Sequence, residues 1–261
     1  MARFAANISF LFTELPFLDR IQAAAATGFG AVECHYPYDT SAEATRAALD
    51  EAGIPMLGIN TRNGTPSDDG GSRDTGLAAV SGREADSLAR VHQAVDYAHA
   101  IGGRAVHVTA GDGHPDDLAA RDAFVAALRR ASERSDRLTF LIEPLNRREN
   151  PAYFLRSTAQ ALDILDRVGH PNVRLMFDLY HAEINEGSVL ERLPSLLPRI
   201  GHIQVAAVPD RGEPDTAWPD LPAVCRTLDA LGYDGWIGAE YRPRGTSQDG
   251  LGWLRRMASL R

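Results

Sequence analysis

The sequence feature that most constrains the fold is a short unit that recurs along the chain. In each copy an Ala- and Leu-rich amphipathic stretch ends in glycine, and an apolar run follows within a few residues. The copies are AAAATGFGAVE, LDEAGIPMLGIN, AHAIGGRAVHV, LDRVGHPNVRLMFD, LPRIGHIQV and LDALGYDGWIGAE. Glycine is favoured just past a helix end because it adopts the left-handed conformation without strain. The apolar runs do not alternate, which is typical of parallel strands covered on both faces.

Eight apolar runs are predicted as strands, and a helical stretch follows each. They lie near Phe4–Ser9, Gly30–Glu33, Met56–Asn60, Ala105–Thr109, Thr139–Glu143, Val173–Asp178, His202–Val205 and Trp236–Glu240. Eight such repeats predict an α/β fold, a (β/α)₈ TIM barrel. The alternative is a doubly wound open sheet, but FLFTELP follows the first strand in place of a glycine-rich phosphate turn. We expect residues 1–261 to form a single domain, because no low-complexity linker divides them.

One irregular segment interrupts this pattern after the third predicted strand. Residues 61–82 are rich in Gly, Asp and Ser and contain NGTPSDDGGSRDTG. Long loops at the mouth of a barrel can close over a bound substrate. We therefore predict a long loop insertion at about 61–82, with the capacity to act as a lid.

The charged residues exclude several classes of function. The net charge is -8, which argues against a nucleic-acid partner because phosphate backbones bind to basic surfaces. All 27 basic residues are arginines. The absence of lysine excludes Schiff-base aldolases, pyridoxal phosphate enzymes and phosphate-loop NTPases, all of which need a lysine amine.

The remaining compositional features favour a cytoplasmic protein without a membrane partner. The N-terminal run MARFAANISFLF lacks a small-residue cleavage site, and its length fits a buried strand better than a membrane span. Cys34 and Cys225 have neither metal-binding nor redox spacing, as expected for reduced thiols. A homo-oligomer is left open.

Polar residues stand at the predicted strand ends, where TIM barrels carry their active sites. They are Asn7, Glu33, Asn60, His107, Glu143, Asp178, Gln204 and Glu240. The last four offer oxygen ligands, and carboxylates that follow apolar runs such as LMF and WIGA are costly to bury without a partner. We therefore predict that these four share one divalent cation. Oxygen-only ligands favour Mg²⁺, with Mn²⁺ as the second choice.

Several motifs resemble those of the hydroxypyruvate isomerase family of xylose-isomerase-like barrels. They are RFAANISFLF, GFGAVEC, FLIEPLN, LMFDLYHAEINEG, IGHIQVAAVPDRGEP and GWIGAEYRP, in the family's order from end to end. The resemblance implies a metal-dependent aldose–ketose type isomerase that interconverts hydroxypyruvate and tartronate semialdehyde, or isomerises a related 2-oxo sugar acid. It assigns the metal ligands to Glu143, Asp178, Gln204 and Glu240, and the catalytic acids to Glu143 and Glu240.

Four further residues are predicted to contact the small hydroxy-carbonyl acid substrate. His181 follows Asp178 by three residues, and its family counterpart contacts substrate oxygens. Arg211 could hold the substrate carboxylate through a bidentate fork. His202 alternates with Gln204 and should point inward with it. His107 is the weakest candidate, because its position also suits a buried, hydrogen-bonded histidine.

The expected mechanism is proton transfer through an enediolate, with Glu143 and Glu240 as the proton carriers. A ketose 3-epimerase is the alternative activity, although such enzymes typically place a histidine where this chain has Gln204. A catalytically silent sugar-acid-binding barrel is less consistent with the chain, because the carboxylate pair is complete. Endonuclease-like barrels need a histidine-rich multi-metal cluster, and the eight histidines here are scattered. The preferred substrate among hydroxypyruvate, 2-oxo-tetronates and ketoses is left open.

Overall fold

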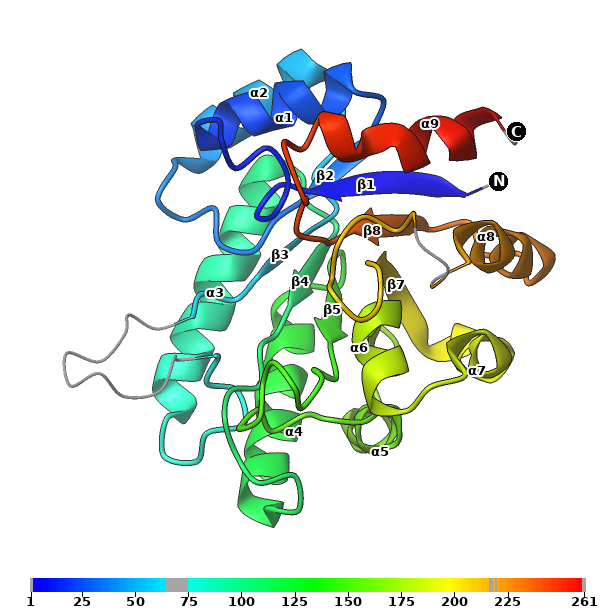
Figure 1. The fold of residues 1–261 in the computed structure, drawn as a ribbon. Coiled ribbons are helices and arrows are strands. Elements are labelled where there is room, and N and C mark those ends of the chain that lie inside the picture. The colour runs from blue at the N-terminus through cyan, green and yellow to red at the C-terminus, as the bar shows by residue number, and fades with distance from the viewer. Residues whose placement is uncertain (1, 64–74, 216–217, 219, 260–261) are drawn as a thin grey trace.

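The chain forms a barrel of eight parallel strands inside a layer of helices in the computed structural model, which describes residues 2–63, 75–215, 218 and 220–259 (Figure 1). The strands are β1 (Arg3–Asn7), β2 (Ala31–Glu33), β3 (Gly58–Asn60), β4 (Ala105–His107), β5 (Thr139–Ile142), β6 (Val173–Asp178), β7 (Ile200–Val205) and β8 (Trp236–Ala239). Their hydrogen-bonded order is β2-β1-β8-β7-β6-β5-β4-β3. A parallel bridge between Val32 and Met56 joins the two outermost strands. The predicted single-domain TIM barrel is confirmed.

At least one helix follows each strand, and two helices follow β6. The helices are α1 (Phe17–Ala26), α2 (Ala42–Ala52), α3 (Glu84–Ile101), α4 (Leu118–Arg134), α5 (Thr158–Val168), α6 (Leu179–Asn185), α7 (Val189–Leu196), α8 (Leu221–Ala230) and α9 (Gly252–Ser259), with 3-10 turns η1 (Leu197–Arg199) and η2 (Asp249–Leu251). Left-handed glycines end α2, α3 and α5, as the recurring unit predicts. None of the helices within the described ranges is long and apolar enough to cross a membrane.

The glycine of LPRIGHIQV does not end a helix, and this part of the prediction was wrong. Helix α7 ends at Leu196 and η1 follows, so Gly201 lies inside β7. A Cβ atom at Gly201 would lie 2.8 Å from the Arg174 Cβ and 2.9 Å from the Leu141 Cδ2. The absence of a side chain here serves close packing between neighbouring strands.

The long segment after β3 is anchored at both of its described ends. No helix or strand lies within residues 61–63 or 75–82, as predicted, and residues 64–74 lie outside the described part of the chain. The Thr61 N–H donates to the His107 carbonyl at 2.8 Å, and the Ala79 N–H donates to the Ala110 carbonyl at 2.7 Å. The action of this segment as a lid stays a prediction.

Two small apolar clusters lie inside the barrel, apart from the main core. Ala5 and Ala31 pack with Leu57 in one cluster, while Ala105 packs with Leu141 and Met176 in another. Bulky Val, Ile and Leu side chains fill most TIM barrels in layers. Here alanines take part in both clusters, and a cavity of about 230 Å³ lies inside the barrel, which is described with the site below.

The main apolar core lies between the strands and the helices, and it gives a test of the fold. Phe140 in β5 is fully buried there, whereas Leu118 at the start of α4 is 63 % exposed. We expect Phe140→Ala to lower the free energy of unfolding by about 3–5 kcal/mol, because it leaves a cavity in this core. Leu118→Ala should change it by less than about 0.5 kcal/mol. Denaturant titration of both variants measures the difference, and similar values for the two would contradict the assigned core.

Candidate active site

Four residues predicted as metal ligands meet at the carboxyl ends of neighbouring strands. Glu143 follows β5, Asp178 ends β6, Gln204 lies near the end of β7, and Glu240 follows β8. Their exposed fractions are 5 %, 2 %, 3 % and 4 %, so all four are buried. The convergence has a simple cause, because parallel strands of a barrel direct their carboxyl ends to one mouth.

His181 connects the first two of these carboxylates. Its Nε2 atom lies 3.7 Å from the Asp178 Oδ2 and 4.0 Å from the Glu143 Oε1. Its Nδ1 atom accepts a hydrogen bond from the Asn146 backbone N–H at 3.0 Å. Burial, and then the charge of Arg211, hold the pKa of His181 well below its usual value. A neutral ring that accepts at Nδ1 carries its proton on Nε2, so the proton faces the carboxylates.

Arg211 supplies positive charge to the other side of the cluster. Its Nη2 atom lies 2.5 Å from the Glu240 Oε1 and 3.8 Å from the Asp178 Oδ2, and its Nη1 atom donates to Glu149 at 3.2 Å. Burial works to lower the pKa of Arg211, but the surrounding carboxylates outweigh burial and raise it. The guanidinium therefore stays charged. In this arrangement it faces protein carboxylates, and its contact with a substrate carboxylate stays a prediction.

The two expected catalytic carboxyls have pKa values shifted in opposite directions. Burial raises the pKa of Glu143 well above its usual value, and the charges of Glu240 and Asp178 raise it further. Burial also raises the pKa of Asp178 to about 7, against the opposing effect of Arg211. Burial disfavours ionisation of Glu240 as well, but His35 and Arg211 outweigh it and lower the pKa. Such a separation is typical of a site that holds a proton donor beside a proton acceptor.

Several buried oxygens in the cluster have no hydrogen-bond partner among the described residues. They are the Glu143 Oε1, the Asp178 Oδ2 and the Gln204 Oε1. Buried acceptors of this kind are costly unless a donor or a cation satisfies them. Glu143, Asp178 and His181 also present ligand atoms within 4.8 Å of one another, and this buried triad could bind a metal ion.

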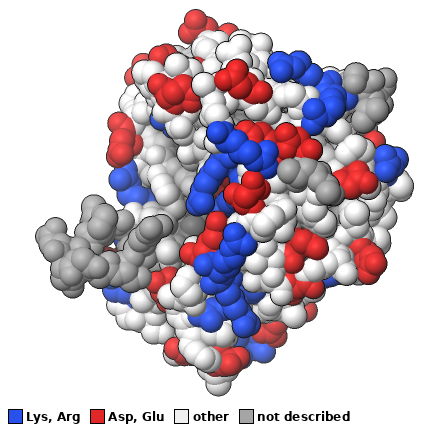
Figure 2. Space-filling view, viewed as in Figure 1, with Lys and Arg blue, Asp and Glu red and all other residues white. Residues whose placement is uncertain are grey.

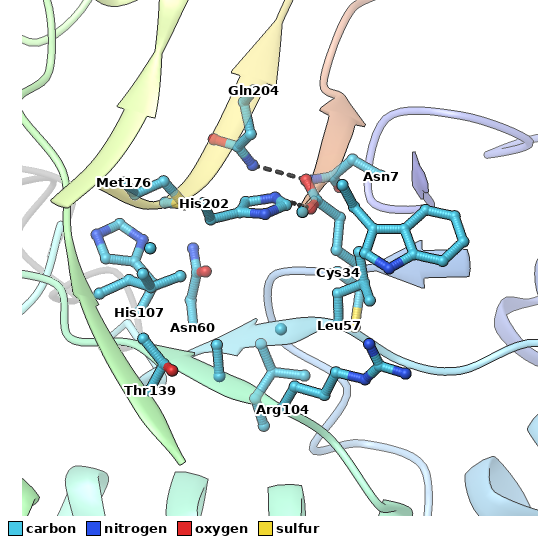
Figure 3. Close-up of a pocket in the computed structure, with 18 residues that line it drawn as sticks. Asn7, Cys34, Leu57, Asn60, Arg104, His107, Thr139, Met176, His202 and Gln204 are labelled. Atoms are coloured by element: carbon cyan, nitrogen blue, oxygen red, sulfur yellow. Dashed lines mark hydrogen bonds and ion pairs between the residues drawn. The ribbon is translucent and has the colours of Figure 1, made fainter. Parts of the chain in front are cut away.

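A cavity of about 230 Å³ lies beside the cluster, and the two remaining predicted residues line it (Figure 3). The His107 Nδ1 lies 3.8 Å from the Glu143 Oε2, and burial lowers the pKa of His107 to about 3. Neither ring nitrogen of His107 has a hydrogen-bond partner in the described part of the chain. The His202 Nε2 lies 2.6 Å from the Glu33 Oε2, so His202 faces Glu33. A substrate contact by either histidine stays a prediction.

Four further residues belong to this site and were given no role from the sequence. Asn7 and Glu33 were identifiable only as polar strand ends. The His35 Nε2 lies 3.3 Å from the Glu240 Oε2. Glu149 accepts a hydrogen bond from the Arg211 guanidinium. His35 follows β2 by two residues, which is a weak signal, and Glu149 lies in a loop where no pattern singles it out.

The molecular surface carries charges of both signs. On the face shown in Figure 2, basic and acidic side chains lie next to one another, and no continuous basic surface forms there.

Comparison with known proteins places the whole chain in one family. Residues 21–257 match the xylose isomerase-like TIM barrel family. The 2-oxo-tetronate isomerase of Cupriavidus necator is 42 % identical over 98 % of both chains. The hydroxypyruvate isomerase of Escherichia coli is 33 % identical over 97 % of this chain and 98 % of its own.

Solved structures agree with this placement. A Brucella melitensis structure described as an AP endonuclease, family 2, has a TM-score of 0.90 and 37 % identity, covering 98 % of this chain and 99 % of its own. The D-allulose 3-epimerase of Methylomonas sp. with D-allulose has a TM-score of 0.76 at 19 % identity over 100 % and 97 % of the two chains, a similarity of fold alone. The chain belongs to the hydroxypyruvate isomerase family of xylose isomerase-like TIM barrels, as its motifs predict.

Proposed function

We propose that this isomerase depends on one divalent cation and moves a proton between neighbouring carbons of a small 2-oxo sugar acid. Its relatives are named after 2-oxo-tetronate and hydroxypyruvate. With hydroxypyruvate as the substrate, the product would be tartronate semialdehyde. The observation that carries the proposal is the burial of Glu143, Asp178, Gln204 and Glu240 in one cluster at the barrel mouth. An unused set of buried carboxylates would be destabilising, so their retention favours a function that needs them.

The residues present fit a hard divalent cation. The unpartnered oxygens of Glu143, Asp178 and Gln204 are buried and offer only oxygen ligands, which favours Mg²⁺ with Mn²⁺ as the second choice. Glu240 completes the proposed set if Arg211 gives up its 2.5 Å contact with the Glu240 Oε1. A bound cation would stabilise negative charge that develops on the oxygens of the substrate.

We assign His181 to the substrate rather than to the cation. A metal-binding imidazole normally donates from its other nitrogen to a nearby acceptor. The His181 Nδ1 instead accepts the Asn146 N–H, which leaves the proton on Nε2 and removes the lone pair that a metal would need. The Nε2–H can donate to a substrate oxygen that lies near Asp178 and Glu143.

Arg211 is the proposed partner of the substrate carboxylate. Its guanidinium is planar and forked, and two aromatic rings hold it, Phe10 at 5.0 Å and Tyr180 at 5.2 Å from the guanidinium carbon. Such a fork binds a carboxylate through two parallel hydrogen bonds. If the substrate carboxylate replaced Glu240 as the partner of Arg211, the guanidinium would still face a negative charge. Glu240 would then be free to act as a cation ligand and proton carrier.

Glu143 and Glu240 are the proposed proton carriers. The opposite pKa shifts leave Glu240 ionised and Glu143 protonated in the protein without a cation, so that one can accept a proton and the other can donate one. One carboxylate takes the proton from the carbon beside the carbonyl and leaves an enediolate. The other carboxyl group then returns a proton to the neighbouring carbon. The hydroxyl proton moves from one substrate oxygen to the other, so the former hydroxyl becomes the carbonyl and the former carbonyl becomes the hydroxyl.

A substrate panel tests the proposed activity. We expect the purified enzyme with Mg²⁺ or Mn²⁺ to isomerise hydroxypyruvate or a 2-oxo-tetronate faster than any free ketose. Exhaustive chelation should abolish turnover, and either ion should restore it. If the enzyme epimerises a ketose at C3 faster than it isomerises these acids, it is a ketose 3-epimerase. Full turnover in a sample verified as metal-free would contradict the cation site.

The proton carriers are tested by isosteric substitution. Glu143→Gln and Glu240→Gln should each reduce kcat by about 10²–10⁴, because each variant loses a proton carrier. Glu186→Gln is the matched control, since Glu186 contacts Thr158 and Arg192 outside the cluster. Steady-state kinetics of folded protein, with folding checked by circular dichroism, distinguishes the variants. Near-normal kcat in either site variant would remove that residue from the mechanism.

A further inference from the structure

Glu33 is a buried carboxylate at the site that the proposed reaction does not use. It ends β2 and is 4 % exposed. The His202 Nε2 and the Gln204 Nε2 each lie 2.6 Å from its oxygens, and the Asn7 Nδ2 donates to it at 3.1 Å. A Cβ atom at Gly238 would lie 2.6 Å from both Glu33 oxygens, so the neighbouring strand leaves space for this carboxylate. A group packed this closely has a defined position.

Glu33 and Glu240 together determine which way the Gln204 amide points. The Gln204 Nε2 donates to the Glu33 Oε1 at 2.6 Å and to the Glu240 Oε2 at 2.7 Å. Carboxylates only accept hydrogen bonds, so the NH₂ group must lie between them. The Gln204 Oε1 therefore faces the other way, where it is buried without a hydrogen-bond partner among the described residues.

Asn7 reinforces the same arrangement. Its Nδ2 atom donates to the Glu240 Oε2 at 2.7 Å as well as to Glu33, so two amide groups join the two carboxylates. The Asn7 Oδ1 accepts the Ser9 backbone N–H at 3.1 Å, which fixes the orientation of the Asn7 amide independently. Figure 3 shows the Gln204 amide and the His202 ring beside Asn7 at the wall of the cavity.

We infer that Glu33 is a positioning residue that holds the oxygen of Gln204, rather than its nitrogen, toward the cation. An amide nitrogen has no free lone pair for a cation, so a flipped amide would be lost as a ligand. The inference rests on the proposed cation site. It assigns Glu33 a role without contact to substrate or cation, and it explains why a further carboxylate is buried beside an already acidic cluster.

An amide at position 33 would remove one of the two constraints while preserving the shape. Its oxygen could accept from Gln204 in the observed orientation, and its NH₂ group could donate to Gln204 in the flipped one. Glu33→Gln therefore leaves Glu240 alone to favour the observed orientation. It should weaken cation binding by about 10- to 100-fold, the usual effect of losing a residue that orients a ligand.

Exchange of the two side chains should restore part of the binding. In the double variant Glu33→Gln/Gln204→Glu, the residue at position 204 is a carboxylate, which presents oxygen in either orientation. The amide at position 33 can donate to it, but the new carboxylate still lies against Glu240. Gln204→Glu alone should be less favourable than the double variant, because it places a carboxylate directly against Glu33 as well as Glu240.

The experiment measures Mn²⁺ affinity from the electron paramagnetic resonance signal of the free ion. It compares wild type, Glu33→Gln, the double variant and the control Glu186→Gln, with Tm of each metal-free protein as the folding check. We expect a 10- to 100-fold loss for Glu33→Gln, an affinity for the double variant between those of Glu33→Gln and wild type, and no change for the control.

Two results would overturn the inference. One is wild-type Mn²⁺ affinity in Glu33→Gln, and the other is a loss that the double variant does not recover. If Glu33→Gln does not fold, Gly238→Ala is tested in its place, because the added Cβ displaces the Glu33 carboxylate. Unchanged Mn²⁺ affinity in Gly238→Ala would also overturn the inference. Absence of Mn²⁺ binding by wild type would contradict the cation site itself and is distinguishable from both.

Discussion

Burial of negative charge at the barrel mouth is the constraint on which this structure depends. Glu33, Glu143, Asp178 and Glu240 are each at most 5 % exposed, and Arg211 forms ion pairs with the last two of them. A buried carboxylate without compensation costs several kcal/mol. Burial raises the pKa values of Glu143 and Asp178, and the charge of Glu240 raises both further. A cation in this cluster would relieve the repulsion, which links stability and proposed catalysis.

The residues around the acidic cluster fix the orientation of its hydrogen-bond donors and acceptors. His181 accepts from the Asn146 N–H and therefore presents a proton, while the NH₂ group of Gln204 is shared by Glu33 and Glu240. His181 and Gln204 thereby have defined donor and acceptor atoms before any ligand binds. Preorganised donors and acceptors of this kind stabilise developing charge without rearrangement during the reaction.

Much of this architecture could be predicted from the sequence. The apolar run Val173–Asp178 coincides with β6, and all eight predicted strands overlap observed ones. The sequence also placed Glu143, Asp178, Gln204 and Glu240 at strand ends, where barrel geometry brings them to one mouth, while their roles stay predictions. The sequence pattern did not predict tertiary contacts between residues that are distant in the chain. The Gly201 position in β7, the Glu149 contact of Arg211 and the Glu33 network depend on neighbours distant in sequence, for which local pattern carries no signal.

The central claim is that buried carboxyl groups, rather than a hydride shift, carry hydrogen between the carbons of the substrate. Turnover of the best substrate in D₂O, followed by NMR or mass analysis of the product at early conversion, tests it most directly. The account predicts solvent deuterium on the carbon that gains hydrogen, because a carboxyl group can exchange its proton with water before returning it. Product without solvent deuterium, formed from labelled substrate whose deuterium migrates intact to the neighbouring carbon, would contradict the two-glutamate mechanism.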